Sequence, residues 1–399
     1  MQPFRFHTLP LSGTALVEAS AGTGKTHAIS TLFVRLLVER ALSVERILVL
    51  TFTEAATLEL KDRIRQRVEA ALRHVGTGGA GDADFAELFQ PRLEAGTRQL
   101  DAGRLRLALT NIDQASIFTI HGFCHKLLAD HAFETRAQFD AELLADDSLL
   151  QDEVMADFWA RELNAAPREV IELLAAHKVT PGKCRNLVDL VTRHPRLRVL
   201  GAGHAGAVPD GVDSEQALLA GFREKLVAYV RAELPRRKAA RSVVSFDDLL
   251  ELLHGALQGP HAASLATSIR RRFPVALIDE FQDTDPTQYA IFEAIYGRTR
   301  HGEDTALLLI GDPKQAIYGF RGADIFAYTT AKRRTPPERR FTLTTNYRSD
   351  PGLVDALQQI FSGLDRPFLL PDIEHPPIRA SRAENTLITG AEAGAPLEI

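Results

Sequence analysis

The sequence predicts an α/β fold built around a parallel β-sheet, and three neighbouring segments carry this prediction. A short, largely apolar strand at 14–18 leads into a loop that contains Gly22 and Gly24. Apolar residues then recur at steps of three and one from 29 to 37, as in a helix with one buried face. A continuously apolar stretch follows at 47–50. Strand, loop, helix and strand in this order form a βαβ unit, whose two strands are parallel.

Four more apolar stretches extend the predicted sheet, at 115–120, 275–278, 305–310 and 341–345. Most of them are apolar without alternation, which is typical of strands covered on both faces. The glycine-rich stretch 76–84 is predicted to be a flexible loop.

A chain of 399 residues is long enough for two or three domains. Residues 125–245 are rich in Ala, Leu, Arg and Glu, with a Gly- and Pro-containing break at 201–212, so we expect a helical insertion there. The net charge of −5 neither predicts nor excludes nucleic-acid binding, because a basic groove can lie on an acidic protein.

The two cysteines, Cys124 and Cys184, have no metal-site spacing, and we expect neither a zinc site nor a disulfide framework. A reducing, cytoplasmic location fits this usage best. Residues 1–10 do not resemble a signal peptide, and no apolar run reaches the ~18 residues of a membrane helix.

The glycine-bearing loop at 19–26 has the pattern of a phosphate-binding loop, with alanine in the first glycine position. Small residues let backbone N–H groups approach phosphate oxygens, and the following helix points its positive end at the same anion. Lys25 is expected to neutralise phosphates, and the Thr26 hydroxyl to bind Mg²⁺. The alternative is a chance glycine-rich turn. The expected nucleotide-binding residues here are Ala19, Ser20, Ala21, Gly22, Thr23, Gly24, Lys25 and Thr26.

The apolar stretch 275–278 ends in two carboxylates, Asp279 and Glu280. We expect Asp279 to hold Mg²⁺ and Glu280 to orient and deprotonate the attacking water. This requires that the strands carrying Lys25 and Asp279 end next to each other, at the carboxyl edge of the sheet. The alternative is a solvated strand end with ordinary acidic residues.

Polar and aromatic residues also follow the later strands. Gln315 can donate to a γ-phosphate and lose that partner after hydrolysis, which makes it a candidate sensor. Arg348 can stabilise charge on the transferring phosphoryl group, and Tyr347 can stack on adenine. Phe320 suits stacking on an unpaired base, although a core phenylalanine in a hairpin is the alternative.

Hydroxyl, imidazole and aromatic groups at two more strand ends suit single-stranded DNA. They are Phe52, Thr53, Thr119 and His121. No second ligand lies at a suitable spacing from His121, so we reject a metal there. The basic runs at 231–241 and 270–272 are read as solvated helix faces with minor weight as DNA contacts.

Seven motifs together resemble the UvrD/Rep-type superfamily 1 helicases, over roughly 14–350. In chain order they are Ala-Ser-Ala-Gly-Thr-Gly-Lys-Thr, Thr-Phe-Thr-Glu-Ala-Ala-Thr, Thr-Ile-His-Gly-Phe-Cys, Phe-Asp-Asp-Leu-Leu, Ile-Asp-Glu-Phe-Gln-Asp-Thr-Asp, Gly-Asp-Pro-Lys-Gln-Ala-Ile-Tyr-Gly-Phe-Arg-Gly-Ala-Asp and Asn-Tyr-Arg-Ser. Within the family the wording is nearest to the 3′→5′ helicase-nuclease subunit of exonuclease V.

The resemblance implies ATP and Mg²⁺ as ligands, single-stranded DNA and duplex ends as substrates, and RecC-like and RecD-like partner subunits in double-strand break repair. It implies a RecA-like P-loop fold with an inserted helical subdomain. The expected domains are 1–124 and 246–345 for the first RecA-like domain, 125–245 for the insertion, and 346–399 for the start of a second RecA-like domain.

The sequence departs from the family pattern in several places. The family's glutamine element before the phosphate loop is not recognisable between Phe4 and Leu11, and the inserted region is short. Only 51 residues follow Arg348, where a RecA-like domain needs on the order of 150, so we expect a truncated product or fragment.

Two functions therefore stay open beside a DNA-dependent ATPase and helicase. One is an inactive ATP- and DNA-binding fragment that acts as an interaction module. The other is a different P-loop ATPase, such as a kinase or transporter subunit. The segment around Gln315 and the Tyr347-Arg348 pair argue against the latter.

Overall fold

The computed structural model describes residues 1–78, 82–135, 141–194, 197, 214–297, 304–317, 324–364 and 367–385. These residues form two compact units. Unit 1 comprises Met1–Thr135 and Leu253–Ile399, and unit 2 comprises Arg136–Leu252. The expected insertion at 125–245 differs from unit 2 at both ends: residues up to 135 belong to helices of unit 1, and unit 2 runs on to Leu252.

A parallel sheet of seven strands forms the centre of unit 1, in the order β1-β9-β2-β8-β7-β3-β4. Every strand pairing in this sheet is parallel, which confirms the predicted fold class. The strands are β1 (Gln2–Pro3), β2 (Gly13–Ala19), β3 (Ile47–Thr51), β4 (Ile117–Thr119), β7 (Val275–Ile278), β8 (Ala306–Gly311) and β9 (Arg340–Leu343).

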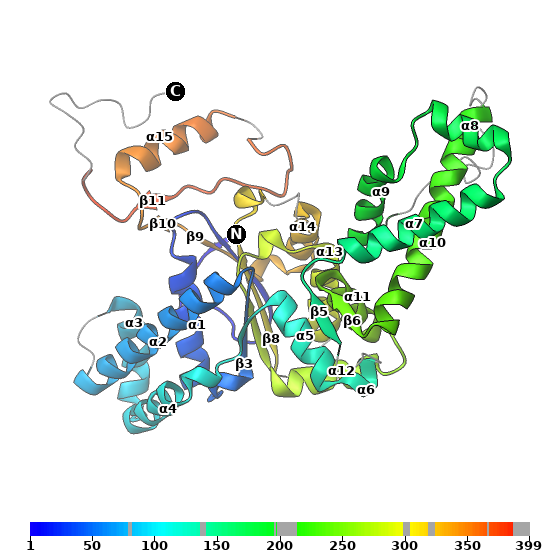
Figure 1. Cartoon of the computed structure of the whole chain (residues 1–399). Coiled ribbons are helices and arrows are strands. Elements are labelled where there is room, and N and C mark those ends of the chain that lie inside the picture. The colour runs from blue at the N-terminus through cyan, green and yellow to red at the C-terminus, as the bar shows by residue number, and fades with distance from the viewer. Residues whose placement is uncertain are drawn as a thin grey trace. The chain divides into compact units, whose positions relative to one another are not determined.

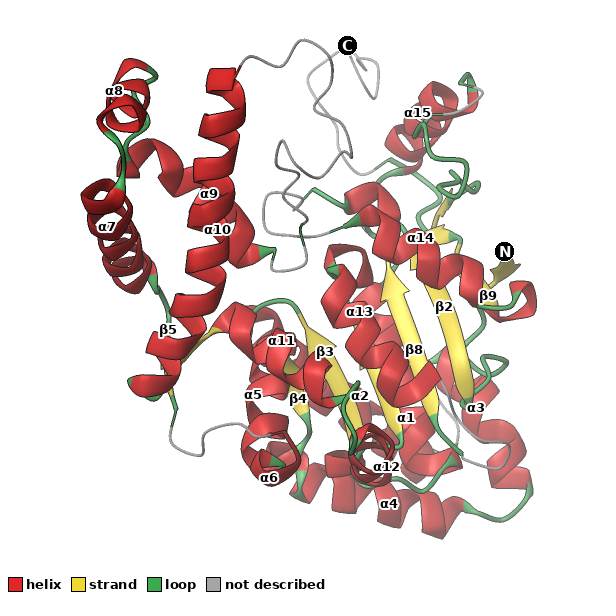
Figure 2. Cartoon of the chain, turned by 90° about the vertical axis from the view of Figure 1, so that its right-hand side faces the viewer, coloured by secondary structure: helices red, strands yellow, loops and turns green. Residues whose placement is uncertain are grey.

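Helices cover both faces of this sheet (Figures 1 and 2). Val17, Val49 and Leu308 point into a core shared with the helices that follow β2 and β3. The alternate residues Leu16, Leu48 and Leu309 are fully buried as well, so the opposite face is also covered. The helices of unit 1 are α1 (Lys25–Glu39), α2 (Glu54–Thr77), α3 (Ala83–Glu94), α4 (Arg98–Thr110), α5 (Ile120–Asp130), α6 (Ala132–Thr135), α12 (Ala262–Arg272), α13 (Pro286–Phe292), α14 (Ile325–Arg334) and α15 (Pro351–Ser362).

The predicted loop at 76–84 is wrong at both ends. Helix α2 runs on to Thr77 and ends at Gly78, whose φ angle of 78° suits glycine. Helix α3 begins at Ala83, where the Asp82 side chain accepts a hydrogen bond from the Asp84 amide and caps the helix. Residues 79–81 lie outside the described residues.

Unit 2 is mainly helical, as predicted for the insertion. It contains β5 (Glu142–Leu144), α7 (Ser148–Ala165), α8 (Arg168–Ala176), α9 (Pro181–Arg193), α10 (Ser214–Ala240) and β6 (Val243–Ser245), and α11 (Phe246–Ala256) begins in it. Phe158, Trp159 and Phe222 pack edge to face in its core. The predicted break at 201–212 lies outside the described residues.

One basic residue of the 231–241 run is not part of a solvated face. Lys238 is buried and bonds to Asp248 at 2.7 Å and to the Ser245 hydroxyl at 2.9 Å. It therefore ties the end of α10 to the start of α11. Among the described residues, no helix is both long enough and apolar enough to cross a membrane.

The chain after β9 forms a separate, two-stranded parallel sheet. β10 (Thr345–Asn346) pairs with β11 (Arg379–Ala380), and α15 lies between them in sequence. The predicted strand 341–345 is thus two elements, because Thr344 separates β9 from β10. Unit 1 includes these residues.

A buried ion pair fixes β2 just before the phosphate-binding loop. The Lys332 ammonium lies 2.9 Å from the Glu18 carboxylate and donates to the Asp372 carbonyl oxygen at 2.6 Å. The Tyr328 hydroxyl donates to the same Glu18 oxygen at 2.9 Å. Glu18 precedes Ala19, so these bonds hold α14 and the segment around Asp372 against the strand that carries the loop.

We predict that Lys332→Ala lowers the free energy of unfolding by about 3–5 kcal/mol, because it leaves the Glu18 carboxylate buried without a cation. Urea denaturation measures this loss. Arg333→Ala is the matched control, because Arg333 pairs with Asp372 at the surface. Equal losses in the two variants would contradict the prediction.

Candidate functional site

The loop between β2 and α1 is shaped by two glycines and one threonine. Gly22 and Gly24 have φ angles of 75° and 88°, a left-handed conformation that favours glycine. The Thr23 hydroxyl donates a 2.7 Å hydrogen bond to the Ser20 carbonyl oxygen and closes the loop. Helix α1 starts at Lys25, so its unpaired N–H groups face this loop. The loop can therefore hold phosphate oxygens.

Lys25 contacts the acidic end of β7. Its ammonium nitrogen lies 2.6 Å from Oε2 of Glu280, and Gln282 Nε2 donates to the same oxygen at 2.7 Å. Glu280 has a φ angle of 48°, which is strained for a residue with a side chain. This backbone conformation is the kind of local strain found at functional sites. A bound phosphate would compete with Glu280 for the Lys25 ammonium.

The predicted adjacency of the two strand ends needs correction. β2 does not pair with β7, because β8 lies between them. The side chains nevertheless meet, because Lys25 and Glu280 reach across the end of β8. The apolar pattern of a buried strand does not encode its neighbours in the sheet.

Three carboxyl groups gather at the end of β7. Burial, and next the charge of Glu280, raise the pKa of Asp279 to about 7. The same two causes raise the pKa of Asp283 to about 6. Oδ1 of Asp283 is buried without a hydrogen-bond partner among the described residues. Such a cluster favours a cation, because positive charge stabilises the ionised forms.

A metal at this site would need ligands from outside the cluster. The described residues contain no group of three or more His, Cys, Asp or Glu side chains suited to a metal ion. Asp279 and the hydroxyl of Thr26 are the protein groups near the loop that can hold one, together with phosphate oxygens and water. This donor set is all oxygen, which suits Mg²⁺.

A cavity of about 860 Å³ lies over the loop. It brings together most of the predicted nucleotide-binding residues with Glu280, Gln315, Tyr347 and Arg348. Arg63, Gln66 and Arg67 of α2 also line it and were not predicted from the sequence. The spacing of Arg63 and Arg67, four residues apart on one helix face, was the available signal.

Arg67 belongs to the wall of the cavity. It is buried, donates to the Thr31 hydroxyl at 2.9 Å, pairs with Asp82 and Asp84, and lies 3.9 Å above the Phe85 ring. Its charge is thus used to join α1, α2 and α3.

The segment around Tyr347 is attached to the loop by one backbone hydrogen bond and one side-chain hydrogen bond. The Tyr347 amide donates to the Gly22 carbonyl oxygen at 2.8 Å, and Asn346 Nδ2 donates to the Ala21 carbonyl oxygen at 3.0 Å. Oδ1 of Asn346 accepts the Arg348 and Ser349 amides, each at 2.8 Å. Asn346, which the sequence did not single out, therefore positions Arg348 beside the loop.

Tyr347 and Arg348 both present exposed side chains at this place. Tyr347 is 62% exposed, and its ring lies about 3.8 Å from where a Cβ on Gly24 would be. The Arg348 guanidinium has no hydrogen bond or ion pair with any residue in the described part of the chain. Both groups are available to a ligand in the cavity.

Gln315 lies at the end of a short 3₁₀ turn, Pro313–Gln315, that follows β8. Its side-chain nitrogen, Nε2, donates to Oδ2 of Asp312 at 2.7 Å. The Lys314 ammonium lies 2.7 Å from the other oxygen of Asp312. The buried Asp312 thus holds the predicted sensor in place.

A second cavity, of about 410 Å³, adjoins this edge of the sheet. Phe52, Thr53, Asp279 and Gln315 are among its lining residues. Thr119 donates to Oε1 of Glu54 at 3.0 Å, next to Thr53, which caps α2. Three of the predicted DNA-binding residues thus gather near the ends of β3 and β4.

The two remaining predicted DNA-binding residues are different. His121 lies in the first turn of α5, and burial lowers its pKa. Phe320 lies outside the described residues.

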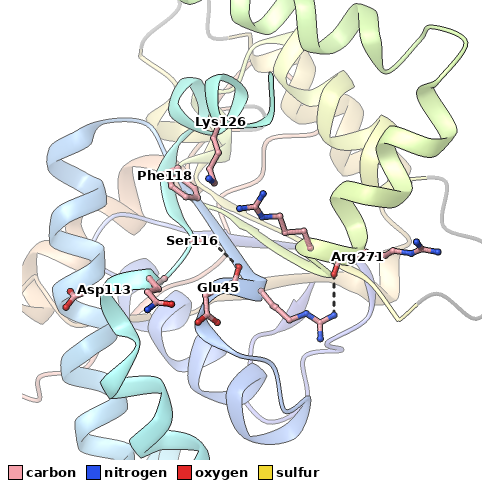
Figure 3. A pocket seen from close by; sticks show the side chains of 10 residues that line it. Glu45, Asp113, Ser116, Phe118, Lys126 and Arg271 are labelled. Atoms are coloured by element: carbon pink, nitrogen blue, oxygen red, sulfur yellow. Dashed lines mark hydrogen bonds between the residues drawn. The ribbon is translucent and has the colours of Figure 1, made fainter. Parts of the chain in front are cut away.

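A third cavity, of about 540 Å³, lies at the opposite edge of the sheet (Figure 3). Arg46, Lys126, Arg271 and Arg272 line it together with Glu45 and Asp113. Lys126 and Arg272 both pair with Asp130, so part of its positive charge is neutralised. The run 270–272 thus lies at the amino ends of the strands, whereas the phosphate-binding loop lies at their carboxyl ends.

Comparison with known proteins agrees with this arrangement. The family model for the UvrD/REP helicase N-terminal domain matches residues 5–336. The RecBCD enzyme subunit RecB of Escherichia coli strain K12 is 34% identical, over 95% of this chain and 40% of the relative. Its counterpart in Haemophilus influenzae is 31% identical, over 92% of this chain and 41% of the relative. That of Mycobacterium tuberculosis strain H37Rv is 35% identical, over 88% of this chain and 30% of the relative.

The chain spans about two fifths of the length of the first two of these relatives and less of the third. The family match covers most of the chain, and the similarity to RecB extends over nearly all of it. The chain belongs to the UvrD/REP helicase family, in the part of it that is close to RecB.

Proposed function

We propose that this chain is the amino-terminal motor part of an ATP-dependent DNA helicase, and that single-stranded DNA stimulates its hydrolysis of ATP. The contact between Lys25 and Glu280 is the observation that carries the proposal. These residues are 255 positions apart in sequence, and their side chains meet at 2.6 Å over the same cavity. A phosphate-binding cation and a candidate base are thus within reach of one γ-phosphate.

Each side chain then has a role that follows from its place. The loop amides and Lys25 bind and orient the phosphates, and Thr26 and Asp279 hold the metal. Mg²⁺, when bound, neutralises charge on the phosphate oxygens. Glu280 accepts the proton of the attacking water once Lys25 has turned to the phosphates. Arg348 adds positive charge at the transferred group, Gln315 reports its presence, and Tyr347 packs against the base.

The same reasoning extends to the substrate and its partners. Phe52, Thr53, Thr119, His121 and Phe320 form the proposed track for single-stranded DNA. By analogy with the RecB relatives, the proposal includes a 3′→5′ direction, duplex ends as substrates, RecC-like and RecD-like partners and a cytoplasmic location. We further propose that the chain combines one RecA-like domain, split by a helical subdomain, with the start of a second.

A second candidate is a module that binds ATP and DNA without turnover. It is favoured by one observation. The Lys25 ammonium is paired with the Glu280 carboxylate, which a phosphate would have to displace. Hydrolysis assays with and without single-stranded DNA separate the two candidates.

We predict that Glu280→Gln retains Mg²⁺–ATP binding but lowers DNA-stimulated turnover by about 10²- to 10⁴-fold, because the amide cannot accept the proton of water. Phosphate release measures turnover, and calorimetry measures binding. Glu293→Gln, at a surface pair with Arg334, is the control. Tight binding without turnover in the wild type and in Glu280→Gln alike would support the second candidate instead.

We predict that Lys25→Ala weakens nucleotide binding by about 10- to 100-fold, because it removes a charged hydrogen bond to the phosphates. The measurement is ATP titration followed by intrinsic fluorescence or calorimetry. Lys61→Ala is the control, since Lys61 pairs with Asp113 at the surface. Unchanged affinity and turnover in Lys25→Ala would refute the assignment of the loop.

We predict that the metal-free chain loses stability as pH rises from about 4 to about 7 because of Asp279. The pKa of this carboxyl is about 7 in the fold and about 3.9 in an unfolded chain, so the folded chain binds the extra proton in this window. The free energy of unfolding should fall by at most about 1.4 kcal/mol per pH unit from this group. Urea denaturation in a chelator should show that Asp279→Asn lacks this component. A pH-independent difference between the two proteins would contradict the prediction.

A further inference from the structure

Gln282 joins two strand ends that carry different parts of the proposed site. Its Nε2 donates to Oε2 of Glu280 at 2.7 Å, and its Oε1 accepts the Asp312 amide at 2.8 Å. The side chain is only 2% exposed, so both bonds are formed away from water. The neutral amide of a glutamine can donate to a carboxylate through its nitrogen and accept from a backbone N–H through its oxygen at the same time.

The structure leaves no room beside this side chain for a side chain at Gly311. A Cβ at Gly311, the last residue of β8, would lie 2.6 Å from Oε1 of Gln282 and 3.1 Å from its backbone nitrogen. Gly311 has an ordinary backbone conformation, so the need for glycine here comes from the close approach of Gln282. The glycine and the glutamine therefore form one fitted contact between β7 and β8.

The bonds continue from Asp312 to the predicted sensor. Oδ2 of Asp312 accepts from Gln315 Nε2 at 2.7 Å, and Oδ1 accepts the Lys314 amide at 3.1 Å. Gln315 lines both the cavity over the phosphate loop and the cavity that contains Phe52 and Thr53. Movement of the Glu280 carboxylate can thus reach the segment between the two cavities through Gln282 and Asp312.

Nucleotide binding must disturb this chain of bonds at its start. The Lys25 ammonium and Gln282 share one oxygen of Glu280. When the Lys25 ammonium turns to phosphate, that oxygen of Glu280 keeps its hydrogen bond from Gln282. The carboxylate can then shift toward water. Since the interior is closely packed, a shift there is passed on rather than absorbed.

We propose that Gln282 is a positioning residue that couples the nucleotide site to the segment 312–317, and through it to single-stranded DNA. This inference rests on the proposed function. By linkage, nucleotide changes the Kd for DNA by the same factor as DNA changes the Kd for nucleotide. Gln282 determines the size of this coupling factor, although its side chain contacts neither ligand.

The test measures the coupling factor with a non-hydrolysable ATP analogue, Mg²⁺ and a labelled oligothymidylate. In the wild type we expect at least a fivefold effect, at the lower end of the about 5- to 150-fold that is usual. Gln282→Met keeps a similar shape and removes both bonds, together with the longer 3.4 Å bond from Nε2 to Oδ2 of Asp283. The coupling factor should therefore fall to within about twofold of one. Each separate Kd should change much less than the factor.

A second variant reaches the same contact without altering the glutamine. Gly311→Ala should displace Gln282 and lower the coupling factor in the same direction. Gln288→Met is the matched control, because Gln288 is also buried but only accepts from the Asp285 amide, in the cap of α13. Its coupling factor should equal that of the wild type, and thermal unfolding shows that each variant is folded.

The outcomes separate the inference from the function on which it rests. If the wild type binds neither ligand, the proposed function fails and the inference with it. If the wild type shows coupling and both Gln282→Met and Gly311→Ala retain it, Gln282 is not the coupling residue, although the proposed function stands. The same holds if the wild type binds both ligands without coupling.

Discussion

The contact between the Lys25 ammonium and the Glu280 carboxylate depends on the backbone topology of the parallel sheet. In a parallel sheet all strands end at the same edge, so the residues that follow β2, β3, β7 and β8 are gathered there whatever their distance in sequence. Buried strands supply the rigidity, since alternate residues of the sheet are covered on both faces. The reactive groups can then be polar and strained, because the apolar strands beneath them hold the positions.

This edge also contains charges that the fold alone does not balance. Asp279, Glu280 and Asp283 lie within five residues, and burial together with mutual repulsion raises the pKa of two of them. Lys25 offsets part of this repulsion. A cation and a triphosphate would redistribute it, with the metal taking over the carboxylates and the phosphates taking over Lys25. The same interactions thus favour binding of the metal and the triphosphate together over binding of either one alone.

The sequence predicted the strands and the loop well, because each depends on a local pattern. Continuous apolar runs gave β3, β7 and β8, and helical spacing gave α1. Strand order was beyond reach, since nothing in the apolar pattern of β8 says that it separates β2 from β7. The end of α2 was misjudged because Gly76 is tolerated inside the helix, whereas Gly78 adopts the left-handed conformation that ends it. Composition alone does not distinguish these two glycines.

Two of the residues that sequence reasoning missed share a physical property. Asn346 and Gln282 are neutral amides, and their significance comes from the partners that they join: the phosphate loop and Arg348 in one case, Glu280 and Asp312 in the other. A functional role is easier to infer from the sequence for a charged group in a motif, because few surroundings suit a buried charge. A neutral amide fits many surroundings, so its role is harder to infer. Where a buried amide donates to one strand end and accepts from another, its loss leaves two polar groups without partners at once. Such residues therefore deserve the same weight as the charged groups that they position, since the geometry of the carboxylate and the arginine is set through them.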